Sequence, residues 1–114
     1  MAISLTIWGL IIQLGISNPD IVYRQYQLES GHGSSWLAKE HNNLFGMKCV
    51  KIRSTTQIGC VNGYGVYSSV RESVIDYRLW QLESGVSGLS EKEYLKYLRT
   101  VYIKDKKYLH YCFK

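Results

Sequence analysis

Residues 26–48 read YQLESGHGSSWLAKEHNNLFGMK, and the order of polar and apolar residues in this stretch decides how the chain folds. Glu29 closes an apolar helical pattern, because the Ser-Gly pair that follows it is typical of a helix end. A short second helix is predicted for residues 34–40, and a loop of amide and aromatic side chains follows at 42–46. The sequence therefore predicts a carboxyl group at the end of a helix, opposite a polar loop.

Length and composition indicate one folded domain. A chain of 114 residues is long enough for a modest core and too short for two, so residues 1–114 are assigned to a single domain. Hydrophobic residues make up 46% of the chain, which argues against a disordered tail. The net charge of +5 favours an anionic partner, such as nucleic acid, acidic lipid or a cell-wall polymer, but no basic run resembles a nucleic-acid-binding arm.

The N-terminal residues 3–12, ISLTIWGLII, have the apolar character of a secretion signal. They lack the basic start and the small-residue cleavage site of such a signal, and about ten apolar residues are too few to span a bilayer. We therefore predict a buried first helix, no membrane span and synthesis in the cytoplasm.

Capping signals predict further helices. An Asn-Pro-Asp sequence at 18–20 is expected to open the helix that ends after Glu29, with the Asn18 side chain as its cap. Residues 69–72 (SVRE) and 90–93 (SEKE) have the pattern of capping boxes, in which a serine and a glutamate satisfy each other's backbone amides. The first box opens a helix to about residue 83, and a final turn or short helix is predicted for 108–113.

Between residues 47 and 67 the pattern changes to valines and isoleucines set among Thr, Gly and Tyr, with an Asn-Gly turn signal at 62–63. This composition predicts a small β-hairpin lobe. Helices, a β-lobe and further helices, in this order, suit an α+β domain with a cleft between two lobes.

Cys49, Cys60 and Cys112 are an odd number of cysteines, which does not indicate a disulfide framework. Cys49 and Cys60 could face each other across the hairpin, but we favour buried thiols that pack as small hydrophobic groups. A zinc site that combines cysteines with His41 or His110 lacks the usual ligand spacing, so no metal is predicted.

The Leu-Glu-Ser-Gly motif at 28–31 and the NNLFGMK loop at 42–48 resemble the glucosaminidase domain of glycoside hydrolase family 73. The resemblance covers most of the chain. It implies a lysozyme-like α+β fold, mainly helical, with a small β-hairpin lobe beside a substrate cleft. It also implies a peptidoglycan hydrolase that cleaves the glycan strand as an endo-β-N-acetylglucosaminidase and needs no metal or organic cofactor.

The same resemblance makes Glu29 the catalytic general acid. A helix end disfavours a negative charge and an apolar cleft wall adds desolvation, so both effects raise the pKa of this carboxyl group and keep it protonated near neutral pH. Residues 77–85 (YRLWQLESG) repeat 23–31 (YRQYQLESG) in all but two positions, which makes Glu83 a rival. Glu83 lacks the glycine-rich and NNLFG continuation, so we assign it to the surface.

The NNLFG loop is expected to supply substrate contacts. The resemblance implies that Asn42, Asn43 and Gly46 bind N-acetyl and hydroxyl groups of the sugar. Phe45 is expected either to offer its ring to a sugar face or to pack in the core.

Two tyrosines complete the predicted site. Tyr64, in a tyrosine-rich strand similar to that of the family, is expected to line the groove. Tyr108 ends a segment that resembles the family's Tyr-x-x-Asp-Pro-x-Tyr pattern, with Lys106 in place of the proline, and is expected to assist catalysis. Trp36 and Trp80 lie at helical spacing with leucines and are assigned to the core.

A second carboxylate is missing from the place where family members often have one, because residues 49–71 contain no Asp or Glu. Polar side chains or the substrate's own 2-acetamido group could activate water instead, or the sugar's 6-hydroxyl could attack, as in lytic transglycosylases. Glu40 could also reach the cleft, whereas Glu72 is explained by its capping box. We favour hydrolysis with one indispensable acid, Glu29.

The predicted partner is the glycan strand of bacterial peptidoglycan, bound by a monomer, with no nucleic-acid partner. Without a secretion signal, the protein is expected to reach the cell wall by holin-assisted release or in a phage particle. Two alternatives stay open: a lytic transglycosylase or muramidase of related fold, and a catalytically inactive wall-binding module.

Overall fold

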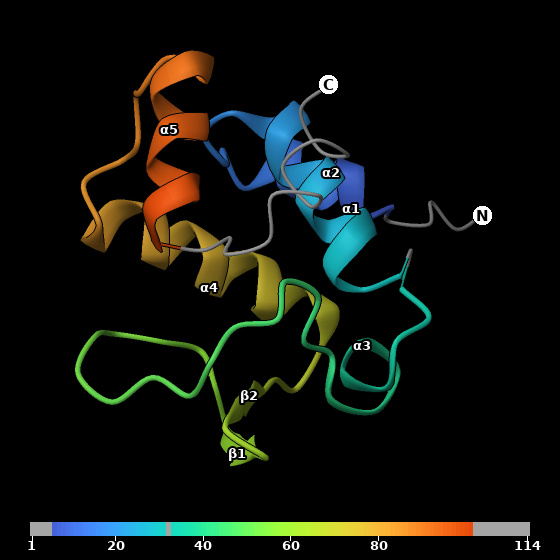
Figure 1. The fold of residues 1–114 in the computed structure, drawn as a ribbon. Coiled ribbons are helices and arrows are strands. Elements are labelled where there is room, and N and C mark those ends of the chain that lie inside the picture. Colours follow the sequence, from blue (N-terminus) through green and yellow to red (C-terminus); the bar gives the residue numbers. More distant parts are fainter. Residues whose placement is uncertain (1–5, 32, 102–114) are drawn as a thin grey trace.

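The computed structural model describes residues 6–31 and 33–101, which form five helices and one two-stranded antiparallel hairpin (Figure 1). In chain order the elements are α1 (Ile7–Gln13), α2 (Pro19–Glu29), α3 (Trp36–His41), β1 (Gly59–Val61), β2 (Tyr64–Val66), α4 (Val70–Glu83) and α5 (Glu91–Val101). This order of helices, hairpin and helices confirms the predicted α+β class. The turn predicted for 108–113 lies outside the described residues.

Helix α4 lies across the middle of the molecule, with α1, α2 and α5 on one side and α3, the hairpin and residues 50–58 on the other (Figure 1). Its buried side joins the other helices through polar atoms as well as through apolar packing. The Tyr77 hydroxyl donates to Gln25 Oε1 (2.6 Å) and accepts from the Tyr94 hydroxyl (2.6 Å), which in turn accepts from Gln81 Nε2 (2.9 Å). Because these four side chains are fully buried, the hydrogen bonds fix how α2, α4 and α5 pack together.

Serine caps begin α4 and α5 as predicted, but only the box at α5 is complete. The Glu72 N–H donates to Ser69 Oγ (3.3 Å), and α4 ends at Glu83. At α5 the exchange is reciprocal, since the Ser90 N–H donates to Glu93 Oε1 (3.0 Å) and the Glu93 N–H donates to Ser90 Oγ (3.2 Å). Local sequence therefore determines both helix starts.

Asn18 occupies the N-cap position of α2 and the helix begins at Pro19, both as expected, but the expected side-chain cap does not form. Asn18 has a left-handed backbone (φ 55°), and its side chain forms no capping hydrogen bond. Instead Asn18 Nδ2 donates to the carbonyl of Leu89 (3.0 Å), which precedes α5. A tertiary contact thus replaces the local cap.

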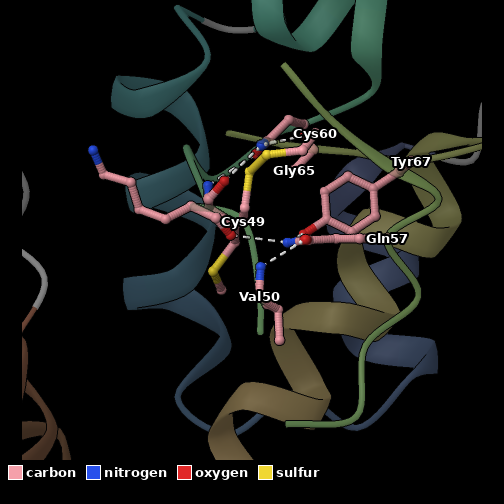
Figure 2. The surroundings of a disulfide bond; sticks show 9 residues. Cys49, Val50, Gln57, Cys60, Gly65 and Tyr67 are labelled. Atoms are coloured by element: carbon pink, nitrogen blue, oxygen red, sulfur yellow. Dashed lines mark hydrogen bonds between the residues drawn. A yellow bond between two sulfur atoms is a disulfide. The ribbon is translucent and has the colours of Figure 1, made fainter. Parts of the chain in front are cut away.

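The β-lobe has less regular structure than the sequence predicts. Its strands contain three residues each, with Cys60 opposite Gly65, and residues 50–58 form an irregular loop. Cys49 and Cys60 are joined by a disulfide bond that closes this loop, so the prediction of buried thiols is wrong for this pair (Figure 2). A disulfide is typical of proteins that work in an oxidising environment.

The Gln57 side chain holds the loop against the hairpin (Figure 2). Gln57 Nε2 donates to the Lys48 carbonyl (3.0 Å) and to the Tyr67 hydroxyl (3.1 Å), while Gln57 Oε1 accepts from the Val50 N–H (2.9 Å). A Cβ atom on Gly65 would collide with the Gln57 side chain. Glycine at position 65 is therefore what allows this close approach.

A buried carboxylate on α4 anchors the other end of the loop. Asp76 has no solvent exposure and accepts hydrogen bonds from Arg53 Nη1 (2.7 Å) and Nη2 (3.1 Å), from Thr55 Oγ1 (2.7 Å) and from the Tyr67 hydroxyl (2.5 Å). Burial and the hydrogen bond to Asp76 raise the pKa of Tyr67 above its ordinary value, so this phenol stays protonated. Asp76 therefore connects the loop, the hairpin and α4.

Removal of the Asp76 carboxylate is expected to destabilise the protein strongly. Asp76→Ala leaves the Arg53 guanidinium and the Tyr67 hydroxyl without their acceptor, which typically lowers the free energy of unfolding by about 3–5 kcal/mol. The exposed Glu83 on the same helix gives the matched control, Glu83→Ala, with an expected change below about 0.5 kcal/mol. Urea denaturation measures both variants, and equal midpoints would contradict the anchoring role of Asp76.

Candidate active site

Glu29 is the last residue of α2, and its side chain is partly buried. Burial removes water from the carboxyl group and raises the pKa of Glu29 above the ordinary value of a glutamate, as predicted. Among the described residues, none forms a hydrogen bond or an ion pair with this carboxyl group. Its two oxygen atoms therefore have no partner in residues 6–31 and 33–101 that would hold them ionised.

Ser30 turns the chain immediately after Glu29. Its Oγ donates to the Tyr26 carbonyl (2.6 Å) and accepts from the Gly33 N–H (2.8 Å), and its carbonyl accepts from the Ser35 N–H (2.9 Å). A Cβ atom on Gly33 would lie only 3.0 Å from the Tyr26 hydroxyl, so the turn passes tightly over that ring. This fully buried serine thereby brings the start of α3 next to the end of α2.

The NNLFG loop is held by its own asparagines. Asn42 Nδ2 donates to the Tyr67 carbonyl (2.9 Å). Asn43 is buried, and its Nδ2 donates to the carbonyls of Met47 (2.9 Å) and Gly65 (2.8 Å) while its Oδ1 accepts from the Met47 N–H (3.0 Å). The amides of this loop are therefore used within the protein, which corrects the expectation that Asn43 contacts a sugar.

Phe45 also lies in the core and not in a groove. Its side chain has no solvent exposure, its ring lies 4.6 Å from that of Tyr77, and the ring of Tyr26 meets it edge-on at 6.5 Å. Of the two roles expected from the sequence, core packing is therefore the one that fits.

Gly46 brings the loop backbone against the acid. Its backbone is left-handed (φ +65°), and a Cβ atom at this position would lie 3.1 Å from Glu29 Oε2 and 3.7 Å from Glu29 Cδ. A side chain here would press on the carboxyl group, which explains why the position needs glycine. The backbone at Gly46 thus forms one wall of the site, and Asn43 sets the shape of that wall.

The remaining predicted residues lie on other elements or outside the described residues. Tyr64, on β2, is partly buried, and Lys48 Nζ lies 4.7 Å from its ring centroid. Glu40 is exposed on α3, and among the described residues no hydrogen bond or ion pair to it is found. Tyr108 lies outside the described residues. The structure therefore brings together Glu29 and Gly46, with Tyr64 on the neighbouring lobe.

The sequence prediction is wrong for Trp36, and it did not include Tyr26 or Trp36 among the candidate substrate-binding residues. Trp36, assigned to the core, is 52% exposed at the start of α3, with its ring 4.6 Å from that of His41. Trp80 does pack partly buried against the core. Tyr26 lies one helical turn before Glu29, on the same side of α2, so its i, i+3 spacing could have identified it. The sequence around Trp36 contains no comparable spacing that would have identified its exposure.

Two of the carboxylates on α4, Asp76 and Glu83, do not supply the missing second group. Asp76 is sealed from solvent with four hydrogen bonds, so its oxygens have no room for a catalytic water. Glu83 occupies the same helix-end position as Glu29 but is exposed, and nothing lies within 4 Å of a Cβ atom built on the glycine that follows, Gly85. The two related sequences thus produce different environments, because only Glu29 has a loop packed against it.

In the part of the chain that the structure describes, no cluster of three or more His, Cys, Asp or Glu side chains could hold a metal ion. None of the described helices combines the length and the apolar character needed to cross a membrane. The chemistry available at this site is that of a single desolvated carboxyl group, and its raised pKa favours the protonated form that a general acid needs.

A partly buried acid at a helix end, with a small β-lobe beside it, defines a lysozyme-like α+β domain, and solved structures of low sequence identity share this fold. A structure titled as a type VI secretion system effector–immunity complex from Pseudomonas protegens matches with a TM-score of 0.66 at 19% identity, over 91% of this chain and 79% of that chain. The catalytic domain of the autolysin Auto from Listeria monocytogenes matches with a TM-score of 0.59 at 21% identity, over 96% of this chain and 76% of that chain.

The family model described as mannosyl-glycoprotein endo-beta-N-acetylglucosaminidase matches residues 10–112. The chain therefore belongs to the glucosaminidase family, glycoside hydrolase family 73. Protein bax of Escherichia coli is 45% identical over 71 residues, which are 61% of this chain. The match covers 26% of that relative, so the chain spans only part of the relative's length.

The raised pKa of Glu29 makes folding stability depend on pH. Both the folded and the unfolded protein are protonated at this site below the unfolded-state pKa of about 4.3, and stability falls as the pH rises through the raised folded-state pKa. Glu29→Gln removes this titration, so its melting temperature is expected to rise relative to wild type between pH 4 and pH 8. Glu83→Gln is the control and should follow wild type; parallel curves for both variants would refute desolvation of Glu29.

Proposed function

We propose that this domain hydrolyses the glycan strand of bacterial peptidoglycan as an endo-β-N-acetylglucosaminidase, with Glu29 as its general acid. The observation that carries the proposal is the partly buried carboxyl group of Glu29, with its raised pKa and the Gly46 backbone against it, in a member of a glucosaminidase family. The catalytic domain of an autolysin has the same fold, which is in keeping with a cell-wall substrate.

In the first step, Glu29 gives its proton to the oxygen that leaves the N-acetylglucosamine C1 atom. The oxygen of the substrate's own 2-acetamido group attacks C1 as the C1–O bond breaks, and the electron pair of that bond goes to the leaving oxygen. We assign the attack to the substrate because residues 49–71 contain no carboxylate and Asp76 is fully engaged. Some glycosidases use the substrate's own acetamido group in place of a carboxylate nucleophile, and these need only one carboxyl group as the acid.

In the second step, the Glu29 carboxylate takes a proton from a water molecule whose oxygen attacks C1. The bond between C1 and the acetamido oxygen breaks, and its electron pair restores the acetamido group. The acid is thus regenerated, and the product carries a reducing N-acetylglucosamine end. Tyr64 and Tyr108 are proposed to orient the acetamido group, with Tyr64 offering a ring held in place by Lys48. Glu40 remains the alternative base.

The disulfide supports a site of action outside the cytoplasm. Cys49 and Cys60 are joined, and Cys60 is exposed to solvent, so a reducing cytoplasm would open this bond. A cell wall lies in a compartment where the bond persists. A muramidase or a lytic transglycosylase would leave a different chain end on the cleaved glycan, so the products distinguish these enzymes from a glucosaminidase.

Loss of the acid is expected to abolish wall degradation. Glu29→Gln should slow the clearing of purified peptidoglycan by at least about 100-fold, the usual contribution of general acid catalysis. Glu83→Gln, which changes the matching glutamate at the end of α4, should keep wild-type activity. Mass spectrometry of wild-type digests should find reducing N-acetylglucosamine ends; reducing N-acetylmuramic acid or anhydro ends would reject the glucosaminidase assignment, and equal rates for the two variants would reject Glu29.

The Gly46 wall is expected to matter for activity more than for stability. Gly46→Ala places a methyl group 3.1 Å from Glu29 Oε2, which displaces the carboxyl group and should lower activity by about tenfold or more. Gly85→Ala is the matched control, because Gly85 has nearly the same backbone (φ +69°) but nothing within 4 Å of the added atom. Both variants should lose about 1–2 kcal/mol of stability from left-handed strain. Similar activity in both would contradict the contact.

A further inference from the structure

The β-lobe carries positive charge without any carboxylate of its own. Residues 47–67 contain no Asp or Glu but include Lys48, Lys51 and Arg53. Only the charge of Arg53 is neutralised by an ion pair in the described structure, since its guanidinium contacts Asp76 at 2.7 Å. The lobe therefore presents a surface that attracts anionic groups.

The loop between the two disulfide-bonded cysteines is fixed at its base but exposed at its tip. Asp76 binds Arg53 and Thr55, Thr56 Oγ1 donates to the Glu72 carbonyl (2.6 Å), and the disulfide closes the ends. Yet Ile52 is 100% exposed, and its neighbour Lys51 is also exposed.

An isoleucine with no packing partner does not stabilise the fold, and the buried anchors hold it in that position. Ile58, near the other end of the loop, is 67% exposed. A fixed loop that displays apolar side chains beside an ammonium group is pre-organised for a ligand that has both short alkyl groups and negative charge, because little flexibility is lost on binding.

We propose that the tip formed by Lys51 and Ile52 binds the peptide stems of peptidoglycan. These stems carry free carboxylates together with small alkyl side chains, which match an ammonium group beside an exposed isoleucine. The inference rests on the proposed function in that it takes peptidoglycan as the substrate. A stem of five residues extends to about 17 Å, so the loop need not lie next to Glu29.

The test uses binding and hydrolysis with two forms of one substrate. Peptidoglycan sacculi free of covalently attached anionic polymers are compared with glycan strands from which an amidase has removed the peptides. Lys51→Gln and Ile52→Ser change exposed side chains, and Lys92→Gln, an exposed lysine on α5, is the matched control. Binding is measured by sedimentation in a Glu29→Gln background, so that it does not depend on turnover.

Lys51→Gln and Ile52→Ser are each expected to weaken binding to intact sacculi and to slow their hydrolysis about two- to fivefold, the range of an exposed ion pair or apolar contact. Neither should alter activity on peptide-free strands, and the effect of Lys51→Gln should disappear at high salt. Lys92→Gln should match wild type on both substrates.

Equal losses on intact and peptide-free substrates would overturn the peptide assignment in favour of contact with the glycan itself. No loss on either would overturn the site. If the wild type degrades neither substrate but the sedimentation difference persists, the proposed hydrolysis fails while the binding site stands.

Discussion

The site depends on one close approach, that of the Gly46 backbone to the carboxyl group of Glu29. An acid at the end of a helix is ordinarily solvated, as Glu83 shows at the end of α4. Glu29 differs because a loop covers it, and the loop can come so near only where no Cβ atom intervenes. Desolvation then raises the pKa of Glu29, which favours the protonated form that a general acid needs.

Two buried polar side chains, Asn43 and Asp76, hold the NNLFG loop and the β-lobe in position, a role that a larger sheet would have in other proteins. The strands contain six residues in all, too few to stabilise a lobe by themselves. Asn43 joins the loop to the hairpin through Met47 and Gly65, and Asp76 joins the hairpin to α4 through Tyr67. Because each of these groups would be costly to bury without its partners, the lobe has one arrangement that satisfies them all.

The sequence predicts what local chemistry determines. The starts of α4 and α5 follow from serine side chains that accept the N–H of the glutamate three positions later, and the end of α2 follows from the Ser-Gly pair after Glu29. Predictions failed where a distant partner decides: Asn18 binds Leu89 instead of its own helix, Cys49 finds Cys60, and Trp36 faces solvent although its spacing with leucines suggested the core. The burial of Asn43 was equally out of reach, since its partners on Met47 and Gly65 depend on how the hairpin folds back.

The charge of the lobe bears on the proposal that a single acid is enough for catalysis. Cleavage of a glycosidic bond develops positive charge at C1, and a nearby carboxylate ordinarily stabilises it. A lobe with lysines and no acid cannot do so, and the Asp76 carboxylate is occupied by Arg53. In the proposed mechanism the compensation comes from the substrate, because a 2-acetamido oxygen that bonds to C1 spreads the charge over its own C–N bond. The composition of the lobe thus favours an enzyme that recognises an anionic wall polymer with its cations and leaves the second catalytic group to the sugar.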